Sequence, residues 1–590
     1  MAALELAALR EAAAVWAAND PDPATAQALQ ELIADAAADP AELVDSFAGD
    51  LQFGTAGLRA AMGPGPNRMN RTVVRRAAAG VAAHLLALAQ EHDGGPAPVG
   101  GLSYRPRAVV GFDARHNSSA FAAETAAIFT AAGIETYLLP APLPTPVLAY
   151  AVRALSCEAG IMVTASHNPK QDNGYKVYLG GRAVAAEAQG VQIVAPHDAD
   201  IAGHIAAVAR AGEFGDTAAI GMAEQGWTVL GPELVENYIA AAAAVADPGT
   251  FPARGLRIVH TSMHGVGHET ALAVLAQAGF SDVHPVPEQA QPDPGFPTVA
   301  FPNPEEPGAM DLAFALAESV DADLVLANDP DADRVALGAR NPATGQWHQL
   351  HGDQVGALLG AHLVLRGGAV DAGAAPVFAN SIVSSRLLAK IAAAAGYQHR
   401  ETLTGFKWIS RVPGLTFGYE EALGYCVAPE LVRDKDGISA GLLLAEMAAA
   451  LKADGRTVFD VLDELALVHG LHVSNQMSIR VEDPSDIVAM MDRLRSQPPA
   501  AFDGSAVTEH KDLSVGTADL PATDGMAYLT RNGTRVIVRP SGTEPKLKCY
   551  LEVIVPVAEA DQLDAARSEA QRALAAVVLD VEGALGLENL

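Results

Sequence analysis

The chain has 590 residues, of which half are hydrophobic, and its 39 Lys and Arg against 70 Asp and Glu give a net charge of −31. This length allows three to five domains with large cores, and the apolar content excludes global disorder. The negative charge argues against nucleic acid or an anionic membrane as a partner. A phosphate ligand would need a concentrated local cluster of Lys, Arg and backbone N–H groups.

The cysteines and the N-terminus indicate a soluble protein of the cytoplasm. Cys157, Cys426 and Cys549 are widely separated and fit neither a metal spacing nor a disulfide framework. The start of the chain has no signal-peptide layout, and no apolar run is expected to reach membrane-spanning length. The sequence does not indicate an oligomeric state.

The N-terminal region predicts helices followed by a glycine-rich turn. Residues 3–48 read as helices with a break at 19–23. In Phe53-Gly-Thr-Ala-Gly-Leu-Arg59, two glycines allow backbone N–H groups to approach an anion, with Arg59 close by. A plain loop explains this turn equally well.

Strands and helices then alternate from residue 107 to residue 155. We expect a strand at 109–112, a helix that ends at Gly133, a strand at 134–139 and a further helix after a proline-rich turn. Such alternation is typical of a largely parallel, doubly wound sheet.

The stretch 157–178 carries the first candidate for chemistry. A buried strand over 158–164 breaks into a polar turn, and a second strand follows at 175–178. Ser166 and His167 therefore lie just past the carboxyl end of a strand, where open α/β sheets place their ligands, and Lys176 lies on the next strand. The alternative is an ordinary polar turn.

The same alternation repeats twice before the chain becomes strand-rich. We expect strands at 255–260, 323–327, 335–338, 375–379 and 416–418, and helices at 231–244, 352–365, 383–395 and 436–453. From about residue 469 onward, strands dominate before a closing helix. The pattern predicts three mixed α/β domains, at 1–228, 229–339 and 340–467, and a C-terminal α+β domain at 468–590.

Three alternate carboxylates, Asp329, Asp331 and Asp333, form the candidate metal loop. We expect an extended segment, on which all three would point the same way. Like charges so close together favour a cation among them, and hard oxygen ligands suit Mg²⁺. A calcium loop does not fit, because Arg334 replaces the glycine and Arg340 replaces the glutamate of that motif. A solvated acidic turn is the alternative.

The segment 539–546, RPSGTEPK, combines a guanidinium, two hydroxyls, a glycine and a lysine in a turn between strands. These groups are typical of a phosphate-binding turn, and Lys548 lies on the same strand face as Lys546. The alternative is a hairpin with solvated basic residues.

These segments together resemble the α-D-phosphohexomutase family over nearly the whole chain from residue 50. The specific matches are TASHNP at 164–169, DPDADR at 329–334 and RPSGTEPK at 539–546. FGTAGLRAAMGPG at 53–65, NGYKVY at 173–178, GFKW at 405–408 and GYEEALGY at 418–425 look closest to the branch with type-two phosphoglucomutases and phosphopentomutases. The resemblance implies three related mixed α/β domains and a helix-on-sheet fourth domain around a central cleft.

The resemblance also implies a role for each matching residue. Ser166 would be the phosphoserine, and its oxygen would hold one Mg²⁺ together with Asp329, Asp331 and Asp333. His167 and Lys176 would assist proton transfer, while Arg59, Arg334 and Lys407 would join the charge cluster at the reacting phosphoryl group. Substrate contacts would come from Glu420, which reads the sugar hydroxyls, and from a set that binds the non-reacting phosphate: Arg539, Ser541, Gly542, Thr543 and Lys548.

The activity implied is a phosphosugar mutase that relays a phosphoryl group through a sugar 1,6-bisphosphate, which also serves as activator. Glucose 1-phosphate is the expected substrate. Ala422 stands where hexose-specific relatives have a serine, so a pentose or mannose phosphate remains an alternative. A bisphosphate synthase, a catalytically silent sugar-phosphate sensor and a Ca²⁺-binding scaffold are further alternatives.

Overall fold

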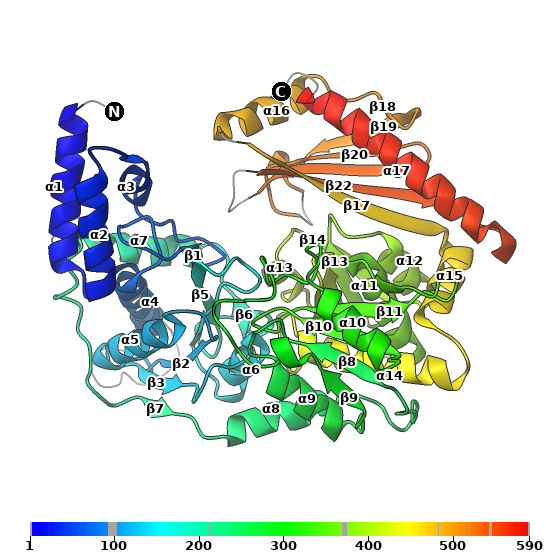
Figure 1. Cartoon of the computed structure of the whole chain (residues 1–590), viewed down its shortest axis with the longest axis horizontal. Helices are drawn as coiled ribbons and strands as arrows, with labels where there is room; N and C mark the ends of the chain where they lie inside the picture. The colour runs from blue at the N-terminus through cyan, green and yellow to red at the C-terminus, as the bar shows by residue number, and fades with distance from the viewer. Residues whose placement is uncertain are drawn as a thin grey trace. The chain divides into compact units, whose positions relative to one another are not determined.

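The structure is a computed structural model that describes residues 3–91, 103–212, 214–367, 375–481, 483–517, 520–541 and 546–587 (Figure 1). The chain forms two compact units. The first contains residues 1–340 and the returning segment 424–449, and the second contains residues 341–423 and 450–590.

Three helices open the first unit, as the sequence predicts: α1 (Ala3–Asn19), α2 (Pro23–Asp35) and α3 (Ala41–Ser46). The break between α1 and α2 has a local cause, because the Asp22 carboxylate accepts the Ala24 backbone N–H and caps α2. Trp16 of α1 is fully buried and meets the rings of Phe47 and Phe214 edge-on, which attaches α1 to the rest of the domain.

The first sheet has the strand order β1-β5-β4-β2-β3-β7, with β6 beside β5. Its strands are β1 (Leu58–Ala61), β2 (Arg107–Phe112), β3 (Glu135–Leu138), β4 (Ala159–Val163), β5 (Asp172–Leu179), β6 (Val191–Gln192) and β7 (Thr228–Val229). Strands β7, β3, β2 and β4 are parallel, whereas β5 is antiparallel to β4. Helix α5 (Ser118–Ala131) packs on one face and α6 (Thr145–Ala154) on the other, and α4 (Arg71–Glu91) and α7 (His197–Ala211) lie beside α5 and α4 respectively. Strands β2 and β4 are buried almost throughout, which explains their continuous apolar sequences.

Helix α4 is long and apolar enough to cross a membrane, contrary to the expectation that no apolar run reaches that length. The helix contains Arg71, Arg75 and Arg76, and 67% of its most apolar window is buried inside the protein. Its contacts with α5 and α7 are those of a core helix.

The second sheet of the first unit runs β11-β10-β8-β9. It comprises β8 (Ile258–Thr261), β9 (Val283–Pro285), β10 (Leu324–Asn328) and β11 (Val335–Arg340), with α8 (Glu233–Ala243), α9 (His268–Gln277) and α10 (Asp311–Ser319). Only β11 is antiparallel to its neighbour β10, so β10 and β11 form a hairpin around residues 329–334. The returning segment adds β16 (Gly424–Cys426) and the start of α14 (Gly437–Ala453), and Gly424 bridges to Arg334.

The second unit contains a parallel sheet and an antiparallel one. The parallel strands are β13 (Val377–Ser381), β14 (Gln398–Thr402) and β15 (Leu415–Glu420), with β12 (Trp347–Gln349), α11 (Gly352–Leu365), α12 (Leu387–Ala394), α13 (Phe406–Ile409) and α15 (Val458–His469) nearby in the chain. The antiparallel sheet has the order β17-β22-β21-β20-β19-β18. Its strands are β17 (Leu471–Arg480), β18 (Ala501–Phe502), β19 (Ser505–Asp512), β20 (Met526–Thr530), β21 (Arg535–Pro540) and β22 (Lys546–Val555).

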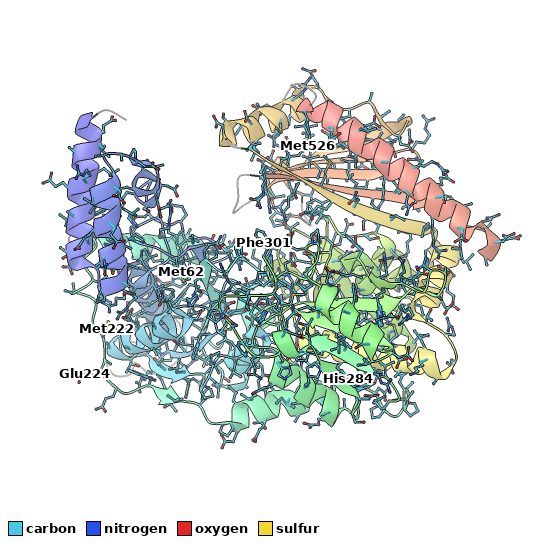
Figure 2. The ribbon with its side chains drawn as sticks, viewed as in Figure 1. Met62, Met222, Glu224, His284, Phe301 and Met526 are labelled. Carbon is cyan, nitrogen blue, oxygen red and sulfur yellow. The ribbon has the colours of Figure 1, made fainter. Side chains whose placement is uncertain are left out.

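Helices α16 (Pro484–Ser496) and α17 (Leu563–Leu585) cover one face of that antiparallel sheet (Figure 1). Met526, labelled in Figure 2, is buried in the core between the two helices and the sheet. The predicted fold class, mixed α/β domains followed by a C-terminal helix-on-sheet domain, is confirmed.

Candidate active site

Ser166 begins the turn that follows β4, at the carboxyl edge of the first sheet. Its side chain is almost fully buried, and its φ of +53° places it in the left-handed region that non-glycine residues rarely adopt. The Thr164 hydroxyl accepts the Ser166 backbone N–H at 2.9 Å, which helps to hold this conformation. Backbone strain of this kind at a sheet edge is typical of functional turns.

Arg115 holds the same turn through hydrogen bonds to its backbone. Its guanidinium donates to four backbone carbonyl oxygens of the serine loop: Ser166 at 2.7 Å, Asn168 at 2.6 Å, Pro169 at 2.7 Å and Asp172 at 3.1 Å. The Arg115 side chain is only 1% exposed and pairs with Asp113 at 3.4 Å. This contact was not predicted, because nothing local in the sequence indicates which backbone atoms an arginine will bind.

The three aspartates converge, although not in the predicted way. The expectation of an extended segment is wrong, because residues 329–333 form a turn in which the Ala332 N–H donates to the Asp329 carbonyl and Ala332 has a φ of +55°. A tight turn between antiparallel β10 and β11 gathers carboxylates that strand alternation would have spread out. One oxygen from each of Asp329, Asp331 and Asp333 lies within 4.8 Å of the others, and all three are fully buried.

The serine hydroxyl meets this trio directly. Ser166 Oγ donates to Asp329 Oδ2 at 2.7 Å, and Arg334 donates to Ser166 Oγ at 2.7 Å. The same Arg334 nitrogen lies 3.3 Å from both Asp329 and Asp333. A hydroxyl 163 positions away in the chain is thus brought against the acidic turn, with a guanidinium beside it.

Two lysines reach the trio from different elements. Lys176 on β5 donates to Asp331 at 2.8 Å and to Asp333 at 2.9 Å. Lys435, in the returning segment, donates to the same Asp333 oxygen. Lys435 was not among the predicted site residues. The available signal was the short charged run 433–436 directly before a long apolar helix, in a chain where basic residues are scarce.

Burial and these cations give the three carboxyls different acidities. Burial raises the pKa of Asp329 to about 8, and the charges on Asp331 and Asp333 add to the effect. Burial also opposes ionisation of Asp333, but Lys176, Lys435 and Arg334 outweigh it and hold its pKa well below the usual range. The pKa of Lys176 is raised, because attraction to Asp331 and Asp333 exceeds the cost of burying its charge.

The trio is suited to a hard divalent cation. Its donors are carboxylate oxygens, and Asp331 Oδ1 is buried without a hydrogen-bond partner among the described residues. A metal ion would give this oxygen the partner that it lacks.

Arg59 and His167 border the serine. Arg59 on β1 donates to Asn168 Oδ1 at 3.1 Å, and His167 Nδ1 lies 3.4 Å from Ser166 Oγ. Burial, Arg334 and Arg59 hold the pKa of His167 well below its usual value, so the imidazole is neutral. Gly57 allows the chain before β1 to lie close to β5, since a Cβ at this position would be 1.9 Å from the Tyr175 carbonyl oxygen.

The remaining predicted residues lie in the second unit. Glu420 ends β15, and its carboxylate accepts the Gly405 N–H at 2.7 Å. Gly405 precedes α13, which contains Lys407. The neighbouring Glu421 accepts the hydroxyls of Ser381 at 3.1 Å and Ser384 at 2.8 Å, and burial raises its pKa to about 7. These groups share the carboxyl edge of the parallel sheet.

The predicted phosphate-binding turn connects β21 and β22. Arg539 lies opposite Lys548 in the register of the two antiparallel strands. The Ser541 N–H donates to the Lys546 carbonyl at 2.8 Å. Arg539, Glu421 and Glu420 all act on the pKa of Tyr550, so the turn and the end of β15 share one neighbourhood in this unit. Gly542 and Thr543 lie outside the described residues.

Comparison with known proteins places these features in one family. Four domains described as phosphoglucomutase/phosphomannomutase match the chain: alpha/beta/alpha domain I at residues 50–208, domain II at 236–342, domain III at 351–467 and the C-terminal domain at 477–570. The "Probable phosphomannomutase" of Haemophilus influenzae is 46% identical over 484 residues, which covers 82% of this chain and 93% of that protein.

Two further relatives extend the comparison. Human phosphopentomutase is 34% identical over 611 residues, covering 94% of this chain and 93% of its own. The solved open form of Paramecium pp63/parafusin, a phosphoglucomutase, superposes with a TM-score of 0.66 over 92% of this chain and 96% of that one, at 19% identity, which bears on the fold alone. The chain therefore belongs to the phosphoglucomutase/phosphomannomutase family of phosphosugar mutases.

Proposed function

We propose that the protein moves a phosphoryl group between C1 and C6 of a hexose, with glucose 1-phosphate and glucose 6-phosphate as the principal pair. The observation that carries the proposal is the position of Ser166 Oγ, 2.7 Å from both Asp329 and Arg334. A hydroxyl between a buried acidic cluster and a guanidinium is suited to accept and return a phosphoryl group, because the transferred group needs its negative charge neutralised on several sides.

In this proposal Ser166 is the phosphoserine, and its phosphate oxygen, Asp329, Asp331 and Asp333 would hold one Mg²⁺. The bound ion would neutralise charge on the phosphoryl oxygens. Arg334 and Arg59 supply fixed positive charge from the protein itself. A phosphoserine carries about −1.5 to −2 charge, so these cations offset a repulsion that the three carboxylates would otherwise impose.

Proton transfer involves two neighbours of the serine. Lys176 remains charged because Asp331 and Asp333 stabilise its ammonium form, so it holds its proton firmly. The lowered pKa of His167 keeps its imidazole neutral and makes it a weak base. We therefore propose that both residues assist proton transfer by hydrogen bonding to the reacting oxygens.

Recognition of the sugar is proposed for residues of the second unit. Glu420 would hydrogen-bond ring hydroxyls, and Lys407 would add positive charge beside it. The non-reacting phosphate would be bound by Arg539, Ser541, Gly542, Thr543 and Lys548. A sugar 1,6-bisphosphate would form from each substrate molecule and, added in small amounts, would prime Ser166.

The proposal also includes the domain limits of the chain and its cellular compartment. We infer domain limits of 1–228, 229–339, 340–467 and 468–590, and a cytoplasmic enzyme that binds sugar phosphates rather than nucleic acid or membrane. The three fully buried cysteines, free of disulfides, support a reducing compartment.

The decisive test is Ser166→Ala with glucose 1-phosphate, Mg²⁺ and a trace of glucose 1,6-bisphosphate, read by coupled formation of glucose 6-phosphate. We expect loss of essentially all turnover and of labelling by ³²P-bisphosphate. Ser262→Ala is the matched control, because Ser262 is also fully buried directly after a strand, and its hydroxyl has no hydrogen-bond partner in the described structure. Full activity of Ser166→Ala would refute the proposal, whereas an unmutated protein that binds sugar phosphates but does not turn them over would point to a sensor.

A pentose phosphate is the second candidate substrate. Ala422 offers no hydroxyl where hexose-specific relatives carry a serine, and human phosphopentomutase aligns over 94% of the chain. Comparing kcat/KM for glucose-, mannose- and ribose-1-phosphate decides among them. A ribose 1-phosphate value more than about tenfold above that of glucose 1-phosphate, equivalent to about 1.4 kcal/mol, would replace the hexose assignment, and accumulation of bisphosphate would indicate a bisphosphate synthase.

A further inference from the structure

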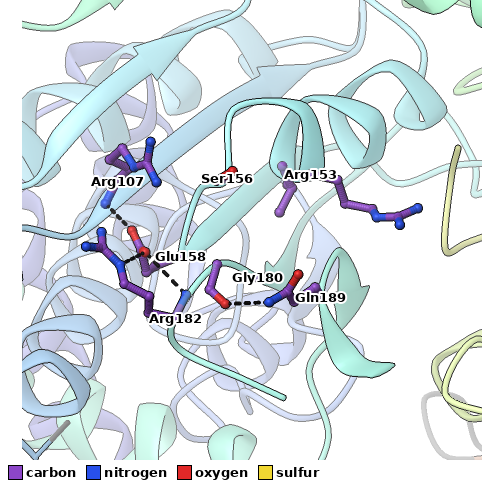
Figure 3. Close-up of a pocket in the computed structure, with 9 residues that line it drawn as sticks. Arg107, Arg153, Ser156, Glu158, Gly180, Arg182 and Gln189 are labelled. Carbon is purple, nitrogen blue, oxygen red and sulfur yellow. Dashed lines mark hydrogen bonds and ion pairs between the residues drawn. The ribbon is translucent and has the colours of Figure 1, made fainter. Parts of the chain in front are cut away.

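A cavity of about 310 Å³ opens at the end of β4 that is remote from Ser166 (Figure 3). Glu158 in its wall directly precedes the first residue of β4, whereas Ser166 follows the last by three positions. Five strand residues at about 3.3 Å each separate the two ends by roughly 16 Å. The cavity therefore does not belong to the site described above.

Three arginines line this cavity, but it contains one carboxylate. Arg182 donates to Glu158 at 2.7 Å and stacks on Tyr104, with its guanidinium 4.1 Å from the ring centre. Glu158 is fully buried and also accepts the backbone N–H of Arg107 at 2.7 Å and that of Arg182 at 3.3 Å. Glu158 thus balances Arg182 and has little capacity left for another cation.

The other two guanidinium charges are not balanced by a carboxylate of the lining. Arg153 donates to the carbonyl oxygens of Pro429 and Glu430, which are neutral acceptors. Burial lowers the pKa of Arg153; the nearby charge of Arg433 adds to this effect, and the charge of Glu430 opposes it. The guanidinium of Arg107 makes no hydrogen bond or ion pair with the described residues.

The end of α6 does not account for this excess of charge. The carboxyl end of that helix points toward the cavity, and a helix terminus carries about half a negative charge. It can offset part of Arg153, which lies in the last turn, but not the second full charge of Arg107. The excess occurs in a chain whose net charge is −31.

Part of the cavity wall is made of close-packed backbone. Gly181 has a φ of +49°, and a Cβ there would lie 2.7 Å from Glu158 Oε1. A Cβ at Gly180 would lie 2.6 Å from the Cys157 carbonyl oxygen. Gln189 then donates to the Gly181 carbonyl at 2.8 Å (Figure 3), which holds the loop around the cavity.

We propose that this cavity is a second anion site, which binds a small ligand through a phosphate group. Guanidinium groups match the geometry of phosphate oxygens, and a phosphate dianion would carry the charge opposite to Arg107 and Arg153, which no carboxylate of the lining pairs with. The volume lies at the lower end of ligand pockets, so a free phosphate or a small phosphate monoester fits better than a nucleotide. The inference uses none of the residues assigned to the mutase site and stands independently of that function.

The test uses the full-length protein and phenylglyoxal, a reagent that modifies accessible arginines, with the modified peptides quantified by mass spectrometry. Inorganic phosphate, added at constant ionic strength against chloride, should slow the modification of Arg107 in a saturable way. Arg153→Gln should raise the phosphate concentration needed for half-protection of Arg107 at least tenfold, because one charged donor is lost. Arg105→Gln is the matched control, since Arg105 lies two residues away, is exposed and donates to the Gly133 carbonyl outside the cavity.

Each outcome has a defined meaning. A second series with glucose 6-phosphate distinguishes a monoester from free phosphate as the better ligand, and either result supports the site. Absence of Arg107 protection by either ligand, or equal shifts in Arg153→Gln and Arg105→Gln, would overturn it. Arg107→Gln should lose the binding yet retain wild-type mutase turnover, which separates failure of this site from failure of the proposed reaction.

Discussion

Replacing Arg115 by methionine tests whether the protein holds its reactive serine in place through the backbone. Methionine keeps much of the length and apolar stem but removes all four hydrogen bonds to the carbonyl oxygens of residues 166–172. It also leaves the buried Asp113 without its cationic partner, although the Ser118 hydroxyl still donates to it.

The magnitude follows from the strained conformation that these bonds maintain. A non-glycine residue in the left-handed region costs about 1–3 kcal/mol, and Ser166 has a φ of +53°. If the loop relaxes when its clamp is removed, this amount is lost from the reactive conformation, which corresponds to about a 5- to 150-fold lower kcat. KM should change little, because Arg115 contacts the loop backbone rather than the substrate groups proposed above.

The assay measures kcat and KM for glucose 1-phosphate, together with the thermal midpoint of each variant. Arg254→Met is the matched control, because Arg254 also donates to three backbone carbonyls, of Phe251, Ala253 and Ala278, and lies over an aromatic ring. Both variants should lose stability, but only Arg115→Met should lose kcat. Arg115→Lys should restore little, since one ammonium cannot reach four carbonyls. A folded Arg115→Met enzyme within threefold of wild-type kcat would refute the reasoning.

Three further outcomes are expected. Lys435→Met should lower turnover at least tenfold without raising the Mg²⁺ concentration for half-activity, because Lys435 adds positive charge at Asp333 and is not a ligand; a higher Mg²⁺ requirement would contradict this. Asp331→Asn should raise that Mg²⁺ requirement at least tenfold, measured by titrating the chelator-treated enzyme, and an unchanged requirement would exclude Asp331 as a ligand. His84, which contacts His197 at 3.0 Å, has its pKa lowered to about 4 by burial and by the neighbouring histidine. Between pH 6.5 and pH 4 the unfolded chain therefore binds more protons than the folded protein, so the free energy of unfolding falls as the pH is lowered. His84→Gln should reduce the difference in unfolding free energy between pH 7 and pH 5 by about 2 kcal/mol in urea titrations. An unchanged difference would count against this reasoning.

Local patterns were sufficient to predict most elements. The strand before Ser166, the helix at 352–365 and the break at 19–23 depend on nearest neighbours, on burial and on capping groups that the sequence displays directly. The meeting of Ser166 with Asp329 was also predictable, because both follow strands at carboxyl edges and both belong to motifs of one family.

Contacts that depend on the packing of distant segments were not predictable. Lys435 is 102 residues from Asp333, and Arg115 binds backbone atoms, which no side-chain pattern reveals. The geometry of the acidic turn was wrong for a related reason: alternating aspartates satisfy an extended strand and a tight turn equally well, and only the β10–β11 hairpin decides between them. Helix α4 was overlooked because alanine contributes to hydropathy without forming a conspicuous apolar run.

The returning segment 424–449 has a consequence for how this protein can be divided. A fragment that ends at residue 340 would keep the serine, the aspartates and β5, yet it would lack Lys435 and would leave Asp333 with a weaker set of counter-charges. Gene fusions, split-enzyme reporters and domain exchanges among relatives should therefore not be cut at 340 alone. Evolution of this half of the molecule is likewise tied to a stretch encoded some eighty codons downstream.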